Sequence, residues 1–191
     1  MNMRNVNIVA RYESKLLRRD IVFLGFVVIA LVGISLWQMI KQGRVNVFWY
    51  KVALPSSFPF FSMYYYNLVQ VLIALFVCME VVYRERKKDA MEVFLCRPFR
   101  NSEYCIGRFL GIFRMFLFVN ICVLLVCMYI NLWVVGAPFN VWIYVFYLLT
   151  LSLPTLIFVL GCALCISGMV KNRPVSVLVL GLWGLGVYFY L

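Results

Sequence analysis

The densest cluster of ionisable side chains lies in residues 83–111, YRERKKDAMEVFLCRPFRNSEYCIGRFLG, between two long apolar runs. Both signs of charge are mixed there. Glu85 and Asp89 are four residues apart, and so are Lys88 and Glu92. This spacing is typical of a solvated helix. A loop that only sets membrane orientation needs Lys and Arg alone, so the acidic residues indicate a further role.

An apolar edge crosses the same stretch. On a helix over 83–95, Met91, Phe94 and Leu95 fall on one face. Pro98 disfavours helical geometry at the residue before it and predicts a break. Mixed charge around an apolar anchor suits specific contact with a protein. A merely solvated loop is the alternative interpretation.

A second helix is expected after the break. Asn101 and Ser102 are both good N-terminal caps, and Glu103 favours the positive start of a helix. Gly107 and Gly111 form a GxxxG, which allows close helix packing as the chain enters the next apolar run.

Little else in the chain could do chemistry. No His is present, which removes the commonest general base and metal ligand. Cys162 and Cys165 form a CxxC inside an apolar run, with no second pair; we interpret them as small residues that let helices approach. No phosphate loop of the form GxxxxGK followed by Ser or Thr occurs. We expect no catalytic, metal-binding or cofactor-binding residues, and we expect that the chain is not an enzyme.

The elements that position these residues are apolar helices. The chain has 191 residues, 65% hydrophobic and 13% charged, with a net charge of +11. Such a composition predicts an all-α polytopic membrane protein, and its charge is better explained by orientation in the bilayer than by nucleic acid. We treat 1–191 as a single transmembrane domain. About five spans are expected, at 21–40, 60–83, 109–135, 141–169 and 175–191.

Two features qualify these spans. The span at 141–169 is long enough to tilt or kink at Pro154. The last has 17 residues, at the short limit, and we expect the sequence to be an N-terminal fragment of a longer chain.

The distribution of Lys and Arg predicts the orientation. The N-terminal segment carries five, residues 84–108 carry seven and 170–174 carry two, whereas 41–59 carries three and 136–140 none. The N-terminus, 84–108 and 170–174 are therefore expected on the cytoplasmic side.

Residues 8–20, IVARYESKLLRRD, predict an amphipathic helix before the first span. The expected apolar stripe consists of Ile8, Val9, Ala10, Tyr12 and Leu16. A basic patch that only sets topology is the alternative interpretation.

Five polar residues fall inside the expected spans: Asn67, Gln70, Glu80, Arg114 and Asn120. They are costly in lipid and should face protein or water. Glu80 and Arg114 lie near the same membrane edge, where a structural pair or snorkelling is favoured over a role in transport. The three amides either line a path between two subunits or form helix–helix hydrogen bonds.

The charged stretch resembles the first cytoplasmic loop of exporter-type ABC-transporter permeases, the second ABC membrane-domain family. That family has Glu-Arg-Lys, then Glu, Pro, Tyr and Gly-Lys/Arg-x-x-Gly before the third span. The matching residues here are Glu85-Arg86-Lys87, Glu92, Pro98, Tyr104, Gly107-Arg108 and Gly111. Ala90-Met91 stands where a Gly-Thr pair is frequent. RYESKLLRRD resembles the family's elbow helix, and ALPSSFP, YYYN and LSLPTLIFVLG look like a Bacteroidetes-type branch.

The resemblance implies a permease subunit in a bacterial inner membrane, with a separate ABC ATPase subunit and a second permease half as partners. The loop would be a coupling helix that docks on the ATPase. Its implied contact residues are Glu85, Arg86, Lys87, Lys88, Asp89, Met91, Glu92, Phe94 and Leu95. An ion-coupled secondary transporter and a non-transporting membrane scaffold are the alternatives.

Overall fold

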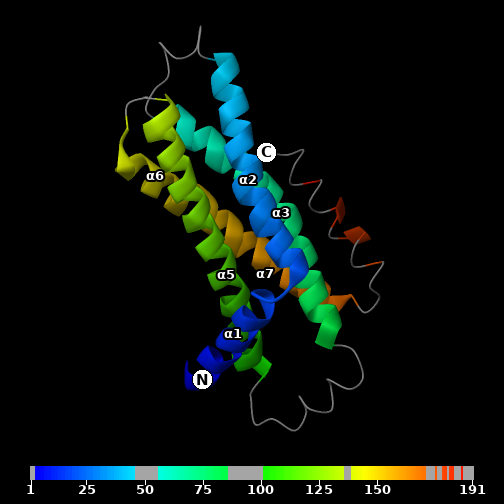
Figure 1. The fold of residues 1–191 in the computed structure, drawn as a ribbon. Coiled ribbons are helices and arrows are strands. Elements are labelled where there is room, and N and C mark those ends of the chain that lie inside the picture. The colour runs from blue at the N-terminus through cyan, green and yellow to red at the C-terminus, as the bar shows by residue number, and fades with distance from the viewer. Residues whose placement is uncertain are drawn as a thin grey trace. The chain divides into compact units, whose positions relative to one another are not determined.

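A computed structural model describes residues 3–45, 56–85, 101–135 and 139–170, together with the single positions 175, 178, 179, 181, 182 and 186 (Figure 1). The described residues form helices and no strand. The elements are α1 (Met3–Leu17), α2 (Ile21–Val45), α3 (Ser57–Glu85), α5 (Asn101–Ile130), η1 (Asn131–Val135), α6 (Val141–Tyr147), η2 (Leu148–Ser152) and α7 (Leu153–Met169), where η marks a π-helical turn.

Three helical stretches are long and apolar enough to cross a membrane: Phe58–Tyr83, Ser102–Trp133 and Val141–Met169. They confirm the expected apolar helices at 60–83, 109–135 and 141–169. The expected run 21–40 lies inside α2, and Met3–Leu17 with Ile21–Trp37 make a fourth candidate if they are taken as one broken span. Most of the expected run 175–191 lies outside the described residues. Several long apolar helices together indicate a multi-pass membrane protein.

Helix α5 begins at Asn101, as the capping residues predict. It continues without a break for 30 residues, so the helix expected after Pro98 and the third expected span are one element. The break at Pro98 itself lies outside the described residues.

The chain forms two compact units. The first comprises Met1–Asp20, Gln70–Met115 and Leu156–Leu191, and it contains α1 with the start of α5. The second comprises Ile21–Val69 and Phe116–Thr155. In the second, Phe23 and Phe26 of α2 pack on Phe116 of α5, with ring centroids 5.5 and 5.7 Å apart. Edge-on and tilted ring contacts of this kind stabilise an apolar core.

A π-helical turn precedes Pro154. The backbone N–H of Leu153 bonds the carbonyl of Leu148, five residues earlier. Proline has no N–H and crowds the preceding turn of a helix, so the irregularity expected at Pro154 takes the form of a wider turn just before it. Such turns frequently occur at functional sites.

Candidate functional site

The expected coupling stretch is flanked by two described helix ends. Helix α3 ends at Glu85, and α5 starts at Asn101. The remaining eight expected contact residues, from Arg86 to Leu95, lie outside the described residues. The part of the charged stretch that the structure describes best is its C-terminal end, in the first turns of α5.

Helix α1 crosses the first turns of α5 and packs on them (Figure 1). The Asn5 side-chain amide donates a 3.2 Å hydrogen bond to Glu103 Oε2, and the Ser14 hydroxyl donates a 3.1 Å bond to the carbonyl oxygen of Gly111. These pairs are separated by 98 and 97 residues in sequence. Since later residues of α1 meet later residues of α5, the two helices run in the same direction.

Two glycines of α5 allow this close contact. A Cβ at Gly107 would lie 2.8 Å from the carbonyl oxygen of Val6 and 2.8 Å from Val9 Cβ. A Cβ at Gly111 would lie 2.7 Å from Glu13 Cβ and 2.8 Å from the carbonyl oxygen of Ala10. The expected close packing at the GxxxG is confirmed; its partner, α1, was not predicted.

The buried face of α1 differs from the expected stripe. Its buried residues are Val6, Val9, Ala10, Glu13 and Leu17. Val9 and Ala10 were predicted correctly, but Ile8 and Tyr12 are 51% and 55% exposed. Gly107 faces Val6 and Val9, and Gly111 faces Ala10 and Glu13, so the glycine surface of α5 determines which face of α1 is buried.

The junction of α1 and α5 carries buried charge. Glu13, Glu103 and Arg108 are each less than a tenth exposed. The Arg108 guanidinium lies 6.0 Å from the centre of the Tyr104 ring, at the limit of a cation–π contact. Burial on this scale requires partners to offset the loss of hydration, and the Asn5 amide supplies one for Glu103.

Arg114 is held by α1. Its guanidinium donates a 3.0 Å hydrogen bond to Asn7 Oδ1. The expected pairing of Arg114 with Glu80, which is half-buried in α3, stays a prediction. The bond to Asn7 adds a third polar link between α1 and α5.

The expected intramembrane amides are all buried. Asn67 of α3 donates a 3.1 Å hydrogen bond to the Ser152 hydroxyl of η2, which is the helix–helix bond that one of the two interpretations expects. Asn120 donates within its own helix to the carbonyl of Phe116, at 2.8 Å. Gln70 is 3% exposed.

Sequence reasoning missed one buried polar pair. The Asn131 amide donates a 2.8 Å hydrogen bond to the Tyr144 hydroxyl. Asn131 was the last polar side chain in the run 109–135, and that isolation was the available signal. Asn131 begins η1 and Ser152 ends η2, so each π-helical turn supplies one residue of a cross-helix bond.

The part of the chain that the structure describes contains no group of three or more His, Cys, Asp and Glu residues that could hold a metal ion. What the described site offers is a closely packed, hydrogen-bonded junction between α1 and the first turns of α5. No protein-family model, no curated protein and no solved structure matches the chain.

Proposed function

We propose that this chain is the membrane-spanning permease subunit of an ABC exporter in a bacterial inner membrane. A separate ATPase subunit would hydrolyse ATP, and a second permease half would complete the path. The observation that carries the proposal is the junction of α1 with the start of α5. It lies at the end of the charged stretch whose motif order resembles that of the exporter-type permeases.

The continuity of α5 supports a coupling role. Thirty helical residues extend about 45 Å, longer than the roughly 30 Å hydrocarbon core. Its first turns therefore extend beyond a span of ordinary length. A displacement at Asn101 would pass along one unbroken helix to the residues inside the bilayer.

The attachment of α1 supports the same role. Close packing at Gly107 and Gly111, together with the Ser14 and Asn5 hydrogen bonds, joins α1 to the first turns of α5. The two would move as one body. ATP binding by the partner would then shift the permease between two states by acting on a single junction.

The docking contact is assigned to the charged stretch. Met91, Phe94 and Leu95 would enter a groove of the ATPase subunit, and the surrounding charges of both signs would determine partner choice. The contact charges are Glu85, Arg86, Lys87, Lys88, Asp89 and Glu92.

The test is affinity purification of the tagged chain from its native membrane in mild detergent, followed by mass spectrometry. A double variant, Glu92→Lys with Phe94→Asp, reverses one charge and removes one apolar anchor. The matched control, Glu92→Asp with Phe94→Leu, alters the same positions but keeps charge and apolarity. Membrane insertion of each variant is checked by alkaline extraction.

We expect an ABC ATPase to co-purify with the parent and with the conservative control, and to be lost with the disruptive double variant. A stable, inserted parent that recovers no ATPase would contradict the permease assignment and favour a scaffold or an ion-coupled transporter. An ATPase retained by the disruptive variant would move the contact away from this stretch.

A further inference from the structure

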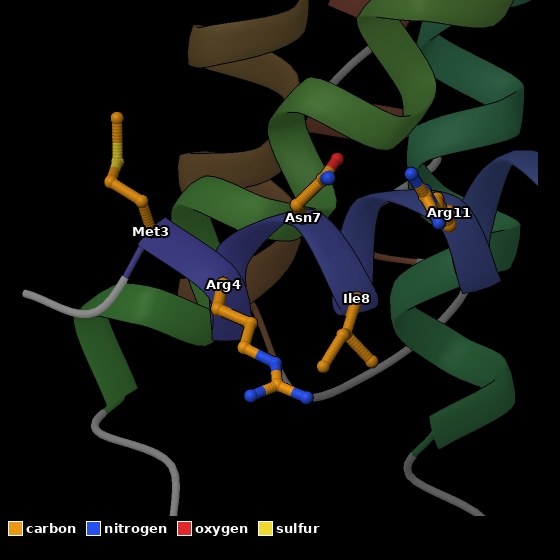
Figure 2. A pocket seen from close by; sticks show the side chains of 5 residues that line it. All are labelled: Met3, Arg4, Asn7, Ile8 and Arg11. Atoms are coloured by element: carbon orange, nitrogen blue, oxygen red, sulfur yellow. The ribbon is translucent and has the colours of Figure 1, made fainter.

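The exposed face of α1 contains an open depression of about 550 Å³. It is lined by Met3, Arg4, Asn7, Ile8 and Arg11. Figure 2 shows these side chains projecting from successive turns of α1, with the Arg4 guanidinium near Ile8. The opposite face of α1 is fixed against α5 by Gly107 and Gly111, so the depression lies on a firmly held helix.

The polar lining favours an anion. Arg4 and Arg11 are seven residues apart, which places them on one face of the helix. Asn7 lies between them, and its Oδ1 accepts a hydrogen bond from Arg114. That bond places the Arg114 guanidinium next to Asn7, and the Nδ2 group of Asn7 is a hydrogen-bond donor. None of the five lining residues is acidic.

The apolar lining favours a lipid as the source of that anion. Met3 is 73% exposed and Ile8 51% exposed. Such exposure is unfavourable in water but favourable beside acyl chains. The neighbouring Tyr12 is also exposed, and tyrosine is enriched at the headgroup level of membranes. A soluble phosphate would gain nothing from these side chains.

We infer that the depression on α1 binds the headgroup of an anionic phospholipid. The phosphate would accept hydrogen bonds from Arg4, Asn7 and Arg11, since guanidinium groups match phosphate oxygens in geometry and charge. The part of the acyl chains nearest the headgroup would contact Met3 and Ile8. The site does not depend on the ATPase partner, so it stands or falls independently of the proposed permease function.

The test is native mass spectrometry of the full chain in neutral detergent, titrated with dioleoyl phosphatidylglycerol or dioleoyl phosphatidylcholine. The variant Arg4→Gln with Arg11→Gln removes two charges from the depression. The control Arg18→Gln with Arg19→Gln removes the same charge from two exposed residues just beyond α1. A third variant, Ile8→Ser, changes only the apolar lining.

We expect the first phosphatidylglycerol to bind the Arg4/Arg11 variant about tenfold more weakly than the parent, with a much smaller change in the Arg18/Arg19 control. Ile8→Ser should weaken phosphatidylglycerol binding although Arg4, Asn7 and Arg11 are all retained. Equal losses in both arginine variants, or equal affinity of the parent for the two lipids, would overturn the site. Displacement of the lipid by inorganic phosphate at equal concentration would also overturn it, because the ligand would then be the free anion.

Discussion

The Ser14 hydroxyl of α1 donates a hydrogen bond to the Gly111 carbonyl oxygen of α5, across 3.1 Å. The same hydroxyl lies 2.8 Å from the carbonyl oxygen of Ala10 in its own helix, so its proton is shared between the two acceptors. This reach is possible because Gly111 has no side chain to separate the backbones. Packing and hydrogen bonding therefore act at the same point of the α1–α5 junction.

Gly111→Ala should destabilise the junction. The new methyl group would meet Glu13 Cβ and a backbone oxygen at less than 3 Å, and overpacking of this kind costs about 1–3 kcal/mol. Unfolding in mixed micelles by SDS titration, followed by far-UV circular dichroism, measures the change. Limited proteolysis should also cleave α1 faster in the variant.

The matched control for that substitution is Gly161→Ala in α7, where an added Cβ meets nothing within 4 Å. Alanine is the better helix former by roughly 1 kcal/mol, so the control should be unchanged or slightly stabilised. Equal destabilisation by both substitutions would show that the close helix approach at Gly111 is not the cause of the lost stability.

Ser14→Ala should cost less than Gly111→Ala. It removes one hydrogen bond between helices, worth about 0.5–1.5 kcal/mol, and leaves the packing in place. Ser35→Ala is the control, because the Ser35 hydroxyl bonds the Leu31 carbonyl within its own helix. The same SDS titration compares them, and a loss at Ser35 as large as at Ser14 would refute a specific role for the Gly111 bond.

Asn67 and Ser152 should be energetically coupled. Both are buried, and the Asn67 amide donates to the Ser152 hydroxyl at 3.1 Å. A double-mutant cycle with Asn67→Ala and Ser152→Ala should give a coupling energy of about 0.6 kcal/mol, the average for such bonds between membrane helices. A cycle of Asn67→Ala with Asn131→Ala should be additive, because Asn131 bonds Tyr144 instead. Coupling of the same size in both cycles would contradict a direct bond.

Cys105 should report the orientation of α5. It is exposed near the start of that helix, whereas Cys78 of α3 is buried. In single-cysteine variants, a membrane-impermeant maleimide should modify Cys105 from the cytoplasmic side only, and Cys78 much more slowly from either side. Labelling of Cys105 in intact cells would contradict the orientation that the Lys and Arg counts predict.

The sequence was sufficient for features that depend on neighbouring residues. The start of α5 follows from Asn101, Ser102 and Glu103, because capping acts within one turn. The positions of the long helices follow from long, mainly apolar runs, since a span needs about 20 predominantly apolar residues. The close packing at Gly107 and Gly111 was also readable from their spacing.

Features that depend on distant residues were not predictable. Nothing local indicated that Gly107 and Gly111 receive α1. The stripe of α1 was partly wrong because both of its faces carry apolar side chains, Ile8 and Tyr12 on one and Val6 and Val9 on the other. Periodicity alone does not show which of the two faces is buried. The surface of α5 at Gly107 and Gly111 determines that.

The separation of 97 residues between Ser14 and Gly111 has a consequence for synthesis of the protein. Ribosomes add about 5–20 residues per second, so α1 emerges roughly 5–20 s before its partner surface exists. During that interval the face of α1 that contains Val6, Val9 and Ala10 has no α5 to cover it. The junction can therefore close only after the first turns of α5 have been synthesised.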